Sequence, residues 1–170
     1  MTEDVVGILP HKPQIEAFNV VTGLIFHSLY QDFPVRQVIR AASLGKPLDD
    51  LCETPEETRV LPSGIKQMAG ETYIRHSNIP PTVYLEEILA WLEAEGFIRS
   101  TPRGDYSPPS YQITRQTFTI LGNAPEGITE RLGTRLDRAV QSVGKEAGKA
   151  AVSEVVGRII GATLKSWTQQ

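Results

Sequence analysis

Apolar positions recur at helical spacing in the N-terminal part of the chain. Between Ile15 and Tyr30 they are three and four residues apart, as on one face of an amphipathic helix. A second, shorter helix is predicted from the start signal of Asp32 and Pro34 to a stop at Gly45. The supporting positions are Phe18, Val21, Ile25 and Leu29 in the first helix and Val35, Val38, Ile39 and Ala42 in the second.

The next segment changes in composition. Lys46 to Pro62 holds three prolines and five acidic residues, which favours a solvated loop with few core contacts. Ser63 can cap a third helix, which the prolines of "SNIPP" end because proline lacks an N–H donor. A fourth helix opens at Pro81 or at the threonine after it, and Gly96 closes it in a left-handed conformation. Its apolar face is Leu85, Ile88, Leu89 and Leu92.

After Gly96 the apolar period changes from about 3.6 to 2 residues. The short runs "FIRS" and "SYQIT" are rich in aromatic and β-branched residues, and "TPRGDYSPP" between them is rich in turn formers. They predict a β-hairpin with a long tip. Thr114 then begins a short helix that Gly122 closes, and the folded domain is expected to end near Pro125.

A short helix, a Pro-rich turn, a helix ending "WLEAEGFI" and a hairpin ending "YQITRQTFTIL" together resemble the winged helix-turn-helix superfamily. The match covers roughly residues 63–121, with the Ile15 to Tyr30 helix as a supporting first helix. The resemblance implies that the fourth helix is a recognition helix, that the hairpin is a wing, and that Thr114 caps the next helix. The glycine that often follows this threonine by three residues is Thr117 in this chain.

The expected recognition helix is acidic. Its outer face presents Glu86, Glu87 and Glu93, whereas phosphates and base edges are mostly contacted by Arg, Lys, Asn or Gln. The arginines instead cluster around the hairpin, which leaves a wing-led contact with phosphate or the minor groove as the route to nucleic acid. The candidate contact residues are Arg99, Arg103, Arg115 and Arg75, and the alternative is that these are ordinary solvated arginines.

From Ile128 to Trp167 the chain lacks proline and predicts helix. The apolar face switches sides near Gly148, which indicates two packing partners or a break between Gly144 and Gly148. We expect the first half to dock on its own domain and the second to meet another chain, aided by the small-residue patterns "GKEAG" and "GRIIG". A tail folded onto its own domain and a membrane-surface helix are the alternatives. The predicted self-association face is Val152, Val155, Val156, Ile159, Ile160 and Leu164.

The composition of the chain limits the classes of protein to which it can belong. With 40% hydrophobic and 22% charged residues the chain is expected to fold, and a net charge of -3 leans against a dedicated nucleic-acid-binding domain. The single cysteine forms no internal disulfide, and no signal peptide or membrane-crossing stretch is recognised. These features predict a cytoplasmic protein.

Chemistry-bearing residues are few. The histidines, His11, His27 and His76, lie in different segments without metal-ligand spacing. Cys52 has acidic neighbours, which disfavour its thiolate. No nucleophile motif, phosphate-binding glycine loop or acidic metal cluster is present. We therefore expect a non-enzyme without metal or cofactor.

Together these patterns predict an α+β, mainly helical protein: a winged-helix domain over residues 1–125 with an acidic loop at 46–62, and an amphipathic helical tail over 126–170. The expected function is that of a regulator that binds DNA as a dimer. The alternative is a winged helix that serves as a protein–protein interaction module. A third possibility is an effector whose tail oligomerises or perturbs membranes.

Overall fold

The computed structural model describes residues 12–52, 80–103, 107–124 and 129–167. These form mainly helices with one small antiparallel sheet, so the predicted α+β, mainly helical class is confirmed. In the described part of the chain no helix is long and apolar enough to cross a membrane. In chain order the elements are α1 (Lys12–Gln31), α2 (Ala41–Leu44), α3 (Lys46–Cys52), α5 (Pro81–Ala94), β1 (Ile98–Arg103), β2 (Ser107–Ile113), α6 (Arg115–Gly122), α7 (Leu132–Gln141) and α8 (Glu146–Trp167).

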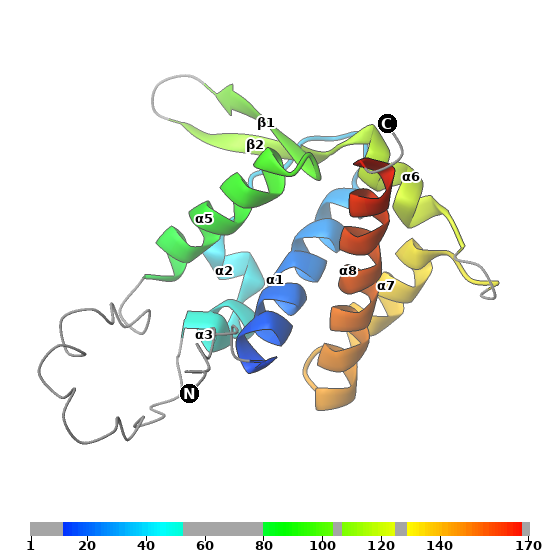
Figure 1. Ribbon diagram of the computed structural model, residues 1–170. Coiled ribbons are helices and arrows are strands. Elements are labelled where there is room, and N and C mark those ends of the chain that lie inside the picture. The colour runs from blue at the N-terminus through cyan, green and yellow to red at the C-terminus, as the bar shows by residue number, and fades with distance from the viewer. Residues whose placement is uncertain (1–11, 53–79, 104–106, 125–128, 168–170) are drawn as a thin grey trace, which may run out of the picture.

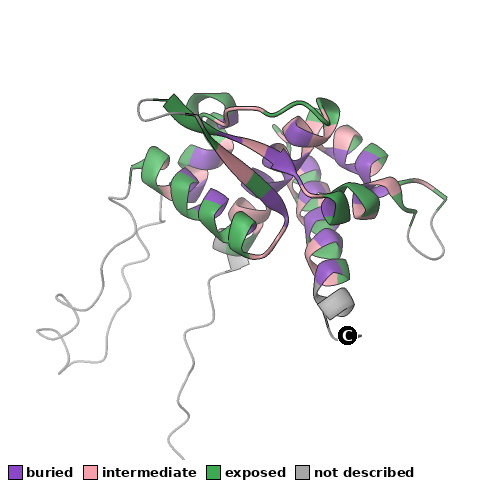
Figure 2. Cartoon of the chain, turned by 90° about the horizontal axis from the view of Figure 1, so that it is seen from above, coloured by how far each residue is buried: buried purple, intermediate pink, exposed green. Residues whose placement is uncertain are grey.

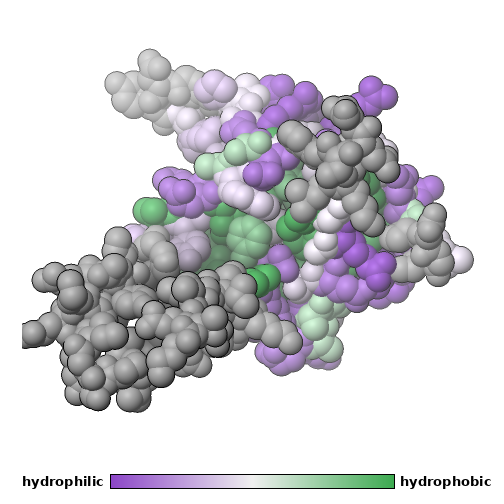
Figure 3. Space-filling view, in the orientation of Figure 1, coloured by the Kyte–Doolittle hydropathy of each residue, from purple (hydrophilic) through white to green (hydrophobic). Residues whose placement is uncertain are grey.

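Helix α1 is the centre of the molecule (Figure 1). Its apolar stripe includes Val21, Ile25 and Leu29, all fully buried, as the helical spacing predicted. Helices α3, α7 and α8 pack against it, and α5 lies beside α3 and β1. On the face seen in Figure 3, hydrophilic residues cover much of the described surface and apolar residues show between them.

Helix α5 follows the sequence prediction closely, and the hairpin forms where it was predicted. The long tip predicted over residues 101–109 is wrong, because β1 runs on to Arg103 and β2 begins at Ser107. The helix begins with Pro81 in its first turn and is followed by Gly96 at φ +76°, a conformation that glycine adopts without steric cost. The strands are exposed toward the tip and buried where they meet the helices (Figure 2). Thr114 caps α6 by accepting a hydrogen bond from the backbone N–H of Thr117 at 3.3 Å. The four apolar positions predicted for α5 are all buried: Leu85, Ile88, Leu89 and Leu92.

The predicted second helix is wrong for most of its length. Only Ala41–Leu44 is helical, and Val35, assigned to the apolar face, is 63% exposed. The backbone of Gln37 instead forms an antiparallel bridge with Tyr111 in β2. The edge of a sheet offers unpaired backbone N–H and C=O groups. Pairing with this edge gives the segment around Gln37 backbone hydrogen bonds that a short isolated helix would form less well.

The predicted acidic loop is also wrong over its first seven residues. Lys46–Cys52 is helix α3, and its side chains Leu48, Leu51 and Cys52 are buried. The loop-like composition of residues 46–62 obscures a short amphipathic helix at its start. In this helix Lys46 Nζ lies 2.7 Å from Asp50 Oδ1, one turn further on. The rest of that loop, and the predicted third helix after Ser63, lie outside the described residues.

The C-terminal tail is two helices. The break falls between Gln141 and Glu146, close to the predicted position. A Cβ at Gly148 would lie 1.9 Å from the carbonyl oxygen of Ser142, so the chain reverses through a contact that only glycine permits. Both helices pack on α1, and α8 also packs on α7.

Candidate nucleic-acid interface

The predicted contact arginines fall in three places. Arg99 lies near the start of β1, and Arg115 is the first residue of α6. Because Ile98 pairs with Ile113, these two arginines both lie at the base of the hairpin. Arg103 ends β1 and is one end of the irregular register near the tip. The fourth candidate, Arg75, lies outside the described residues.

A buried glutamine orients Arg99. Gln112 is the cross-strand neighbour of Arg99 and is 4% exposed. Its Oε1 accepts hydrogen bonds from Nε and Nη2 of Arg99, at 3.1 and 2.8 Å. Its Nε2 donates to the carbonyl oxygen of Pro34 at 2.5 Å. The side chain of Gln112 therefore fastens both the guanidinium of Arg99 and the backbone of the segment before α2.

The Gln37 bridge adds a third strand-like segment to the sheet. Gln37 N donates to Tyr111 O at 2.9 Å, and Tyr111 N donates to Gln37 O at 2.7 Å. In this antiparallel register Arg36, one residue before Gln37, lies beside Gln112, one residue after Tyr111. Arg36, Gln112 and Arg99 thus form one row across the outer face of the sheet.

The inner face of the sheet is distinct from this outer face. Gln37 points inward, where Ser28 Oγ of α1 donates to its Oε1 at 2.7 Å and its own Nε2 donates to Asp32. Tyr111 also lies on this side, and burial together with the charges of Glu93 and Glu86 raises its pKa. Since side chains alternate along an extended chain, Arg36 projects outward, whereas Ile39 packs against the core.

Helix α5 carries the opposite charge. Glu86, Glu87 and Glu93 are exposed, as predicted, and no basic residue lies in the helix. Glu93 Oε1 also accepts the backbone N–H of Ser100 at 2.7 Å, which ties the helix to β1. Residues 34–37, 98–103 and 107–113, which form the sheet and the segment bridged to it, instead carry three arginines and no acidic residue. The described structure thus has a basic sheet side and an acidic helix side.

The predicted self-association face is occupied by the chain itself. Val152, Val156 and Ile159 are fully buried, and Val155 is 2% exposed, because α8 packs on α1 and α7. Ile160 is half-buried against the same core, and the side chain of Leu164 lies outside the described side chains. The proposed role of this face in binding another chain is therefore corrected: it is core. Self-association by another surface stays a prediction.

The small-residue patterns have different surroundings. A Cβ at Gly157 or Gly161 of "GRIIG" would meet nothing within 4 Å, so these glycines are not packed against another described element. Gly148 of "GKEAG" contacts the turn between α7 and α8. Neither pattern forms a helix–helix contact in the described structure.

His27 and Cys52 are the other candidate residues that the structure describes. His27 Nε2 lies 2.8 Å from Asp137 Oδ1 and links α1 to α7. Cys52 is buried at the end of α3, and its pKa is raised by burial and by the charge of Asp49, in the direction that the sequence predicted. His11 and His76 lie outside the described residues.

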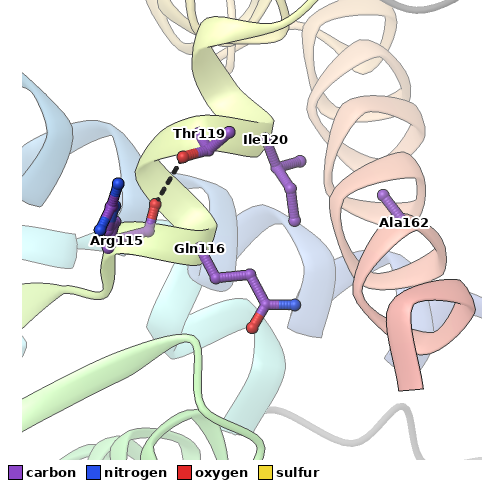
Figure 4. Close-up of a pocket in the computed structure, with 5 residues that line it drawn as sticks. All are labelled: Arg115, Gln116, Thr119, Ile120 and Ala162. Carbon is purple, nitrogen blue, oxygen red and sulfur yellow. Dashed lines mark hydrogen bonds between the residues drawn. The ribbon is translucent and has the colours of Figure 1, made fainter. Parts of the chain in front are cut away.

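A shallow hollow of about 470 Å³ lies between α6 and the C-terminal half of α8 (Figure 4). It is lined by Ile120, which points toward α8, by Ala162 of α8, and by three polar residues of α6: Arg115, Gln116 and Thr119. Arg115 extends away from α8 in the same view.

Sequence reasoning missed two residues of the sheet side, Arg36 and Gln112. Arg36 was assigned to a helical stretch that does not form. The usable signal was a short run rich in β-branched residues, Val35, Val38 and Ile39, directly after Pro34, which is more typical of a strand than of a helix. The position of Gln112 beside Arg99 required the hairpin register.

Known proteins do not supply a family for this chain. No protein-family model matches it, and no curated protein or solved structure is similar enough to count as a match. The functional conclusion therefore rests on the fold and on the opposite charges of the sheet and of helix α5.

Proposed function

We propose that this protein is a winged-helix-like regulator that binds duplex DNA through the outer face of its sheet, with α5 turned away from the duplex. The element order from α1 to β2 supports the proposal: a helix, a short bridging segment, further helices and a hairpin follow one another as in the superfamily that the sequence resembles.

The observation that carries the proposal is the separation of charge. The phosphate backbone supplies most of the affinity of DNA-binding proteins, and arginine is its preferred partner. Arg99 and Arg103 belong to the hairpin itself, and the bridge between Gln37 and Tyr111 adds Arg36 from a distant stretch of the chain. The acidic side of α5 would be repelled by phosphate and by the electronegative grooves.

The experiment is fluorescence anisotropy of the full chain with a mixed-sequence duplex of about 20 base pairs, at about 50 and about 200 mM salt. We expect binding that weakens steeply with salt, because phosphate contacts release counterions. Arg99→Glu with Arg103→Glu should abolish it. An absence of binding at the lower salt would refute the proposal.

A second candidate function has its own observation. On α5, Val83 is 41% and Trp91 is 38% exposed, next to the exposed Glu86 and Glu87. Exposed apolar side chains with an acidic border suit a partner protein that has a basic, apolar groove. Capture of a partner by the full chain, and its loss in Glu86→Lys with Glu87→Lys but not in Arg99→Glu with Arg103→Glu, would support this function.

A further inference from the structure

We propose that Arg36 and Arg99 form a binding row for the phosphates of a DNA duplex, and that Gln112 between them is its positioning residue. The inference rests on the proposed function and names the part of the sheet that would make the contact. Arg36 was not a candidate from the sequence, and it reaches this surface only because Gln37 pairs with Tyr111.

The geometry suits a backbone contact. Neighbouring strands lie about 4.8 Å apart, so the backbones of Arg36 and Arg99, one strand on either side of Gln112, are separated by about 10 Å. Both arginines are exposed on the outer face. Two long guanidinium side chains at this spacing can contact phosphates along one strand of a duplex.

The partner of Arg99 is neutral, and this matters for binding an anion. The amide of Gln112 accepts from two nitrogens of the guanidinium and so fixes its plane without cancelling its charge. The other N–H groups of the guanidinium remain for an oxyanion, which it contacts best in a fixed, fork-like orientation.

Three arginines in the C-terminal part of the fold form ion pairs. Arg135 and Arg158 pair with Glu154, and Arg138 pairs with Glu130 at 2.5 Å. Among the described residues no ion pair is formed by Arg36 or Arg99. Within the described residues, the charges of Arg36 and Arg99 are therefore not cancelled by an ion pair.

Gln112 should act through Arg99. It is buried and also holds the Pro34 carbonyl, so it links the strand that carries Arg99 to the segment that carries Arg36. Replacement by methionine keeps the length of the side chain and removes all three hydrogen bonds. We expect lower duplex affinity with an unchanged salt slope, because no charge is lost.

The test compares duplex affinity at several salt concentrations for Arg36→Gln, Arg99→Gln, Gln112→Met and the double variant Arg99→Gln with Gln112→Met. Lys145→Gln is the matched control, since Lys145 is exposed in the turn between α7 and α8, at the opposite end of the molecule from the hairpin (Figure 1). Thermal unfolding of every variant separates lost binding from lost folding.

We expect each arginine variant to weaken binding about threefold to tenfold and to reduce the salt slope by about 0.9. Lys145→Gln should bind as the parent does, and Gln112→Met should add no further loss once Arg99 is absent. Two outcomes would contradict the binding row but not the proposed function: duplex binding that is weakened equally in all the charge variants, and duplex binding that is unchanged in both arginine variants. Additive losses for Arg99 and Gln112 would remove the positioning role. No duplex binding by the parent would overturn both proposals.

Discussion

Gly23 of α1 faces Val152 of α8 at a distance that leaves no room for a side chain. A Cβ at Gly23 would lie 2.3 Å from Cγ1 of Val152 and 3.1 Å from Cγ2 of Val156. The first and last helices of the described chain therefore meet at a glycine, and this contact places the C-terminal helix in the core.

Gly23→Ala should destabilise the protein by about 1 to 3 kcal/mol, although alanine favours helix, because the added methyl overpacks the α1–α8 contact. Gly157→Ala is the control, since a Cβ there would meet nothing within 4 Å. It should stabilise the protein by about 0.5 to 1 kcal/mol. Urea unfolding measures both. Equal effects at the two positions would contradict the close contact.

Val156→Asp together with Ile159→Asp should prevent folding. Both side chains are fully buried, and unpaired carboxylates in a core cost several kcal/mol each, against a total stability of about 5 to 15 kcal/mol for a typical domain. Circular dichroism on heating should show no cooperative transition. A folded variant with a lower mass in light scattering would instead restore the predicted association face.

Thr117→Val should cost about 1 to 3 kcal/mol, because Thr117 Oγ1 is buried and donates to the carbonyl oxygen of Phe97 at 2.9 Å. Valine keeps the shape and removes the donor. Thr119→Val is the control: its hydroxyl is exposed and donates only to the carbonyl oxygen of Arg115 within α6. A thermal melt that shifts as much for Thr119→Val would show that Phe97 does not depend on this bond.

Asp50 should make stability fall in acid. Burial acts to raise its pKa, but hydrogen bonds and charges from Lys46 and Lys149 outweigh burial and lower the pKa below 3.8. A lowered pKa in the folded state adds stability above the unfolded value, and that stability is lost as the pH falls through the folded pKa. Asp50→Asn should lower stability at about pH 7 and lose less of it by about pH 3.

Urea titrations at these two pH values check the Asp50 prediction. Asp49→Asn is the control on the exposed side of the same helix. The same acid-induced loss in Asp50→Asn as in the parent would assign the effect to other carboxylates.

Some helices and strands could be predicted from the local sequence, because their apolar spacing and their start and stop residues agreed with one another. Helix α5 has an apolar stripe, a proline start and a glycine stop, and Thr114 follows the hairpin where a cap is needed. The segment around Gln37 had no such agreement. Its apolar spacing fitted one helical face, but the edge of β2 supplied hydrogen-bond partners that no local pattern reveals.

The sequence by itself determined the mainly helical class, α1, α5, the hairpin, the break in the tail and the acidity of α5, because each depends on residues close together in the chain. Only the tertiary structure decided that α8 is core and that Arg36 lies in one row with Arg99. Both features depend on contacts between segments that are distant in the sequence: Gly23 with Val152, and Gln37 with Tyr111. Such contacts form only after the local helices and strands exist, because they are set by the apolar surfaces and strand edges that those elements leave uncovered.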